Sequence, residues 1–130
     1  MKKVLIAVVS IVIVVLVVFM VREEKNTWVQ NDNGVWVKQG NPEKTPEEVT
    51  TQQNLIDDAK NLFKEEKESG ADVSSGPCIG KLNDDWVVDI VHNPREAIDN
   101  RPENQCLDYI NGDVKHFIEL DLDGEVQNIH

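Results

Sequence analysis

The chain has 130 residues, with 13 Lys and Arg against 24 Asp and Glu, a formal net charge of −11 at pH 7, and two cysteines. Once the apolar stretch at residues 4–21 and the three residues before it are set aside, residues 22–130 carry a formal charge of −13 and have room for one small domain. This charge excludes nucleic acid and anionic lipid surfaces as principal partners, because phosphate recognition needs clustered Lys and Arg.

Residues 4–21 form an uncharged run in which Ser10 is the one polar residue. As a helix the run would be about 27 Å long, close to the ~30 Å of bilayer hydrocarbon. Its Val and Ile favour a strand in water, but a lone strand in lipid leaves its backbone groups unpaired, so the helix is favoured there. We therefore predict an N-terminal transmembrane helix, with residues 1–25 as the membrane anchor and the lipid bilayer as the partner of residues 4–21.

A cleaved secretory signal peptide is the alternative, because Lys2 and Lys3 precede the apolar run. The residues after Val21 are charged, however, and lack the small pair that a signal peptidase requires. The basic residues Arg22 and Lys25 balance Lys2 and Lys3 across the run, but a short tail ahead of a long domain is typical of a signal-anchor. We expect a single-pass protein of the cell membrane with its C-terminal domain outside the cytoplasm.

Residues 26–46 are predicted to form a juxtamembrane hairpin and a linker. Two short β-prone runs within residues 27–38 flank a turn sequence that ends at Gly34. Because an isolated two-stranded ribbon is marginally stable, Trp28 and Trp36 must pair across it, pack on the main domain or lie at the lipid headgroups. Residues 47–130 then form the extracytoplasmic domain.

That domain is predicted to begin with a helix, with Thr45 before Pro46, or Thr50 with Gln53, as its capping residues. The helix is expected to end near Gly70. Its apolar residues share one face at helical spacing, and they are Leu55, Ile56, Ala59, Leu62 and Phe63.

Beyond the helix the apolar residues alternate with a period of two, which predicts strands at residues 86–92, 105–110, 114–121 and 125–129. The turn sequences Asn111-Gly112 and Asp123-Gly124 predict two antiparallel hairpins, and residues 93–104 an ordered loop. The expected fold class is α+β, with one helix packed on an antiparallel sheet of three or four strands.

Cys78 and Cys106 are predicted to form a disulfide, because two cysteines in a small domain outside the cytoplasm most often pair. The alternative is a metal- or thiol-dependent site that also uses His92 and His116. Zinc sites bring their ligands in closely spaced pairs, and these four residues are widely spaced.

No catalytic residue, metal site or cofactor is predicted. Glu119, Asp121 and Asp123 match early positions of a calcium loop, but the twelfth position is His130 rather than Glu. No phosphate-binding glycine loop, nucleophile motif or metalloprotease motif is present. Asp84 and Asp85, which precede a predicted strand, have no neighbour that would separate their pKa values for acid–base work.

The run at residues 117–126, from Phe117 through Asp121 and Gly124 to Val126, resembles the closing hairpin of PepSY domains. In that family a strand of the pattern aromatic-x-Val-x-aliphatic-Asp meets a glycine turn and a short aliphatic strand. The resemblance extends over residues 50–129. It implies a cystatin-like helix and sheet outside the cytoplasm and a role in restraining peptidases or in other envelope interactions, and it carries no catalytic residue to this chain.

We therefore expect a membrane-anchored, non-enzymatic module that binds an unknown protein or peptide through a sheet edge or through the loop at residues 93–104. Arg95 and Arg101 of that loop are the candidate binding residues, because a guanidinium can grip an acidic group of a partner, although pairing with nearby carboxylates is the simpler role. The remaining alternatives are the metal- or thiol-dependent protein and a structural component of the cell envelope.

Overall fold

The computed structural model describes residues 1, 6 and 26–130. Apart from Ile6, the predicted anchor at residues 4–21 lies outside these residues, so it stays a prediction. No helix among the described residues is both long enough and apolar enough to cross a bilayer. The fold below is that of residues 26–130.

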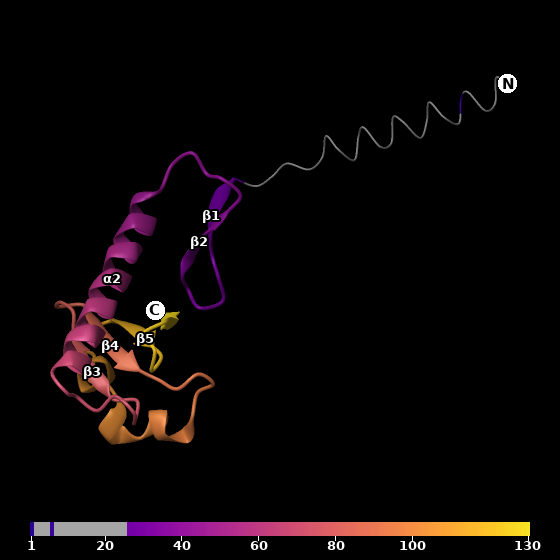
Figure 1. Ribbon diagram of the computed structural model, residues 1–130. Helices are drawn as coiled ribbons and strands as arrows, with labels where there is room; N and C mark the ends of the chain where they lie inside the picture. The colour runs from indigo at the N-terminus through magenta and orange to yellow at the C-terminus, as the bar shows by residue number, and fades with distance from the viewer. Residues whose placement is uncertain (2–5, 7–25) are drawn as a thin grey trace.

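Residues 26–130 form an α+β unit with one long helix, a two-stranded sheet and a four-stranded sheet (Figure 1), so the α+β part of the predicted fold class is confirmed. The helix is α2 (Glu47–Glu68). The small sheet pairs β1 (Thr27–Gln30) with β2 (Trp36–Gln39), and the large sheet contains β3 (Cys78–Lys81), β4 (Trp86–Ile90), β5 (His116–Leu120) and β6 (Val126–Ile129).

The large sheet is mixed, whereas an antiparallel sheet was expected. Its strand order is β3-β4-β5-β6, and the central pair, β4 and β5, is parallel. Parallel neighbours need a crossover of a dozen or more residues, and residues 91–115 supply it. The predicted β5–β6 hairpin at Asp123-Gly124 is confirmed, because β5 and β6 are antiparallel neighbours.

Residues 105–110, predicted as a strand, instead include the helical turn α3 (Leu107–Ile110). The amides of Tyr109 and Ile110 both donate to the Cys106 carbonyl at 3.1 Å, and Asn111 donates to Leu107 at 2.8 Å. Asn111-Gly112 therefore ends a helical turn and is not a hairpin. The crossover also contains two short 3-10 helices, η1 (Ala97–Asn100) and η2 (Pro102–Asn104), where a loop was predicted.

The strand β3 was not predicted at all. It is an edge strand of four residues whose register with β4 shifts between Cys78 and Gly80. Glycine within a strand weakens the local pattern and accompanies bulges, so the sequence carries little strand signal here.

Both faces of the large sheet are covered. Val88 and Ile90 on β4, with Ile118 and Leu120 beside them on β5, pack toward Ala59 and Phe63 of α2. The opposite face carries Val87 and Phe117, which pack with Val114 and Cys106 of the crossover. Each fully buried Val or Ile side chain stabilises the fold by roughly 1.5–3 kcal/mol, so both coverings contribute to stability.

The helix α2 has the predicted apolar face but not the predicted caps. Ala59 and Phe63 are buried, and Leu55, Ile56 and Leu62 pack against the same cluster. Pro46 occupies the N-cap position without a side-chain hydrogen bond, and Thr50 lies inside the helix with its hydroxyl donating to the Pro46 carbonyl. Ser69 and Gly70 follow the last helical residue, which confirms the predicted end.

The β1–β2 hairpin is confirmed and packs on the rest of the unit. Its register opposes Trp28 to Lys38 and Trp36 to Gln30, so the two indoles are not direct cross-strand partners. The Trp36 amide donates to Gln52 Oε1, and Gln52 Nε2 donates to the Gly34 carbonyl, both at 2.8 Å. The side chain of Gln52 thus ties the hairpin to α2.

Gly34 brings the hairpin turn against the C-terminal strand. The Ile129 amide donates to the Asn33 carbonyl at 3.0 Å. Gly34 has φ +75°, and a Cβ there would collide with the Ile129 carbonyl oxygen. Gly112 has φ +79° but no atom within 4 Å of its Cβ position, so it shares the backbone requirement without the contact.

We predict that Gly34→Ala destabilises the protein more than Gly112→Ala does. Both variants place a side chain in the left-handed region, at about 1–2 kcal/mol each, and only Gly34→Ala also pushes the hairpin away from Ile129. Urea unfolding of both variants, with hydrogen exchange of the Ile129 amide, measures the difference. Equal destabilisation and an unchanged exchange rate would contradict this account of how the hairpin docks.

Candidate functional site

The turn α3 exposes a small apolar surface. Leu107, Tyr109 and Ile110 are 63%, 37% and 58% exposed, and within residues 26–130 the one other exposed large apolar residue is Val37. Cys106, immediately before the turn, is buried and bonded to Cys78. The chain is thus fixed to the sheet at Cys106, and the residues after it project outward. We call Leu107, Tyr109 and Ile110 the α3 patch.

A cavity of about 150 Å³ lies beside the α3 patch. Tyr109 and Ile110 line one part of it, and the rings of Tyr109 and Phe117 of β5 form a T-shaped pair, at 5.0 Å between ring centroids. Ligand sites for drug-sized molecules are larger, at about 300–1,000 Å³. The cavity has room for one side chain or a molecule of similar size.

Two carboxyl groups line this cavity. Asp89 of β4 and Glu119 of β5 are partners in the parallel register, so their side chains emerge next to each other on the face that the crossover covers. The Arg95 guanidinium, from the loop before η1, forms an ion pair with Glu119 at 2.5 Å. Arg95 also donates from Nε to Asn100 at 3.2 Å.

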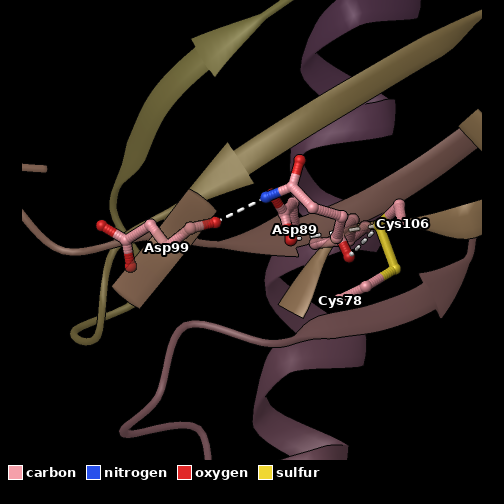
Figure 2. The surroundings of a disulfide bond; sticks show 6 residues. Cys78, Asp89, Asp99 and Cys106 are labelled. Carbon is pink, nitrogen blue, oxygen red and sulfur yellow. Dashed lines mark hydrogen bonds between the residues drawn. A yellow bond between two sulfur atoms is a disulfide. The ribbon is translucent and has the colours of Figure 1, made fainter. Parts of the chain in front are cut away.

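Asp89 is buried without such a partner. The residue is 8% exposed, and among the described residues no side-chain N–H or O–H donates to its carboxyl group. Its recorded side-chain contact is the Cys106 sulfur at 4.0 Å, and a disulfide sulfur carries no proton to donate (Figure 2). Burial first, and then the charge of Glu119, raise the pKa of Asp89 to about 7, although Arg95 and a hydrogen bond from the backbone amide of Ile90 oppose the shift.

A second buried carboxylate, Asp99, is fully partnered. Its oxygens accept hydrogen bonds from His92 Nδ1 at 2.6 Å and from the backbone amides of His92 and Glu96 at 3.1 and 2.7 Å. Burial alone would raise the pKa of Asp99, but these bonds together lower it. The same contact with Asp99 raises the pKa of His92. Asp99 therefore holds the start of the crossover on the sheet and is not free to bind a ligand.

Hydrogen bonds to backbone carbonyls complete the loop at residues 93–104. Asn104 donates to the carbonyls of Ser75 and Ile98 at 2.7 and 2.9 Å, and Gln105 donates to the carbonyl of Asp99. Most of the loop's polar groups thus form hydrogen bonds that stabilise the conformation of the loop. Within residues 93–104, Arg95 is the residue that lines the cavity.

The two candidate arginines therefore have different positions. Arg95 lines the cavity and pairs with Glu119. Arg101 is exposed, 4.0 Å from Glu103, and does not line the cavity. The structure brings only the first of them to the candidate site.

The four residues of the metal or thiol alternative are not gathered together. Cys78 and Cys106 form the predicted disulfide, with their Cα atoms 5.0 Å apart. His92 pairs with Asp99, whereas His116 stacks on Trp86 at 4.6 Å between ring centroids. Among the described residues no three His, Cys, Asp or Glu side chains are close enough to hold a metal ion.

The carboxylates singled out from the sequence have structural contacts. Asp121 Oδ1 accepts the backbone amides of Asp123 and Glu125 at 3.0 and 2.9 Å, which forms the β5–β6 turn. Glu119, the first position of the suspected calcium loop, pairs with Arg95 instead. Asp84 and Asp85 are exposed before β4.

Asp89 and the α3 patch were missed in the sequence. Asp89 is the one charged residue within the apolar run of β4, and a carboxyl group at the centre of a predicted buried strand is a signal that could have identified it. Leu107, Tyr109 and Ile110 could not have been found in the same way, because their residues were interpreted as a strand.

Comparison with protein-family models, with curated proteins and with solved structures found no match to this chain. The resemblance of residues 50–129 to PepSY domains accordingly stays a prediction.

We predict that replacing both cysteines, by Cys78→Ala and Cys106→Ala, lowers the free energy of unfolding by about 3–4 kcal/mol. The disulfide closes a loop with a sequence separation of 28, and its loss increases the freedom of the unfolded chain. Urea unfolding of the double variant and of the reduced wild-type protein should give the same decrease. A decrease below about 1 kcal/mol would show that the crossover is held by its other contacts.

We predict that Asp89→Asn stabilises the protein above pH 7. A carboxyl group whose pKa is raised from 3.8 to about 7 binds more protons in the folded state than in the unfolded state, so stability falls as pH rises between these values. Asn imitates the protonated form, and its advantage should grow from near zero at pH 4 to on the order of 4 kcal/mol at pH 8. Denaturant midpoints across this pH range measure it.

The control for this prediction is Asp113→Asn, which removes a carboxylate that is exposed. It should change the free energy of unfolding by less than ~0.5 kcal/mol at each pH. An Asp89→Asn profile parallel to that of the wild type would contradict the buried, underpartnered state of Asp89.

Proposed function

We propose that this protein is a single-pass membrane protein whose residues 26–130 lie outside the cytoplasm and bind another protein without catalysis. Residues 4–21 are the anchor in this proposal. The α3 patch, with the cavity beside it, is the contact surface. No catalytic residue or cofactor is part of the proposal.

The observation that carries this proposal is the concentration of exposed apolar side chains on α3. Within residues 26–130, three of the four exposed large apolar residues belong to this one turn. Exposed apolar groups gathered beside a cavity and surrounded by charge are typical of protein-binding surfaces, and Tyr is enriched among the residues that dominate binding energy.

The setting of α3 supports rigid presentation of the patch. The disulfide at Cys106 fixes one end of the turn, and Asp99 and Asn104 fix the chain before it. A surface that is ordered before binding loses less conformational freedom when a partner docks. The same disulfide supports a location outside the cytoplasm, where such bonds persist.

The position of α3 also favours this proposal. In Figure 1 the crossover lies at the end of the unit opposite the start of β1, where residue 26 enters. The crossover, and α3 with it, therefore lies far from the end of the unit that follows residues 4–21 in the chain, which supports its use as a contact surface. The formal charge of −13 on residues 22–130 favours a basic partner. The resemblance to PepSY domains implies a peptidase as the partner, and a peptidase is therefore the partner class that we propose.

A photo-crosslinking amino acid in the full-length chain tests the contact surface. We predict that the analogue placed at Leu107 gives a discrete adduct in native membranes and that the same analogue at Val37, the exposed apolar residue of the hairpin, does not. Adding Ile110→Ser should reduce the Leu107 adduct about tenfold or more, because loss of a dominant contact costs at least ~1–2 kcal/mol. Mass spectrometry of the adduct identifies the partner.

Equal labelling from both positions, or no adduct from either, would contradict the binding role and favour a structural envelope component. The wild-type chain should also remain with the membranes after an alkaline wash. Its recovery in the soluble fraction would contradict the prediction that residues 4–21 are a membrane anchor. The crosslinks would then be the test of the α3 patch as a contact surface.

A further inference from the structure

We propose that the cavity beside the α3 patch binds one primary alkylammonium group, which, if the proposed function holds, is a lysine side chain of the partner protein. The inference rests on the charges that line the cavity, on the buried carboxyl group of Asp89 and on the shape of the apolar wall. Each is independent of the identity of the partner.

The charges of the cavity leave one negative charge unmatched when Asp89 is ionised. Arg95 neutralises Glu119 through their ion pair, and among the described residues no second basic side chain lines the cavity. Asp99, the other carboxylate near Asp89, is matched by His92. A single monocation would therefore complete the site, whereas a neutral or anionic ligand would leave Asp89 unpaired or repelled.

Asp89 supplies the unmet hydrogen-bonding capacity. An ionised carboxylate accepts several hydrogen bonds, yet this one is nine-tenths buried, and among residues 26–130 its polar contact is the backbone amide of Ile90, with no side-chain donor. Leaving such a group unpaired is costly, and an ammonium group with three N–H donors would remove that penalty. Asp89 therefore has hydrogen-bonding capacity that an ammonium group in the cavity would use.

The shape and lining of the cavity select an alkylammonium rather than a bare ion. Tyr109, Ile110 and Phe117 provide an apolar wall, and the two rings present aromatic surface on which methylene groups and a cation both pack favourably. Lysine combines a methylene stem with a compact charge. The planar guanidinium of an arginine is bulkier, and Arg95 already occupies that part of the site.

Protonation of Asp89 should regulate binding. The pKa of Asp89 is raised to about 7 by burial and by Glu119, with Asp99 adding to the shift and Arg95 opposing it. Only the ionised form attracts the ammonium group, and the ionised fraction falls to roughly 1% at pH 5. The apparent affinity should thus fall roughly 100-fold from pH 8 to pH 5.

The test uses n-butylammonium chloride and the full-length protein in detergent micelles, at constant ionic strength. NMR titration at pH 8 should show saturable shifts confined to residues around the cavity, such as Tyr109, Phe117 and Glu119. Asp89→Asn, which keeps the size of the side chain and removes its charge, should weaken binding tenfold or more, and n-butanol should not bind. The affinity of the wild type should decrease at pH 5.

Shifts spread over the acidic surface, equal binding of n-butanol, or binding unchanged by Asp89→Asn would each overturn the inference. Failure of the proposed function has a different signature. Butylammonium binding without a crosslink from Leu107 would leave the cavity site standing and remove the proposed partner, whereas a crosslink without butylammonium binding would retain the partner and remove the ammonium site.

Discussion

The disulfide between Cys78 and Cys106 is the constraint on which the rest of the domain depends. It joins the edge strand β3 to the residue that precedes α3, so the crossover between β4 and β5 must pass over one face of the sheet. That passage covers Val87 and Phe117, completes the second apolar cluster and leaves the α3 patch exposed. A small domain with one helix gains a second covering layer in this way without a second long helix.

Two buried carboxyl groups, one on the sheet and one in the crossover, show how the surroundings decide the role of a side chain. Asp99 accepts hydrogen bonds from His92 and two backbone amides, so its charge is stabilised and it acts as a structural clamp. Asp89, on strand β4 of the sheet, has Glu119 as its register partner and a proton-free sulfur as a neighbour. Asp99 thus contributes to stability as a charged group, whereas Asp89 can accept further hydrogen bonds from a ligand.

The spacing of apolar and turn residues predicted correctly the elements that depend on their own residues alone. The apolar face of α2 follows from 3.6-residue spacing, and the β5–β6 hairpin follows from two alternating runs around Asp123-Gly124. This spacing was insufficient for residues 105–110, whose composition suits a strand but whose backbone closes a helical turn onto Cys106. The α2 caps were also misplaced, because Pro46 begins the helix without a side-chain cap.

The amino-acid sequence by itself determined the α+β class, the long helix, the hairpins at Gly34 and Gly124, the disulfide and the acidic charge. These depend on the composition or short-range spacing of the residues involved. Only the tertiary structure decided that β4 and β5 are parallel and that Asp89 therefore stands beside Glu119, with Arg95 and Tyr109 around them. The physical reason is that the periodicity of a strand specifies which residues share its face, whereas the neighbour and direction of that strand depend on how the crossover is held against the sheet.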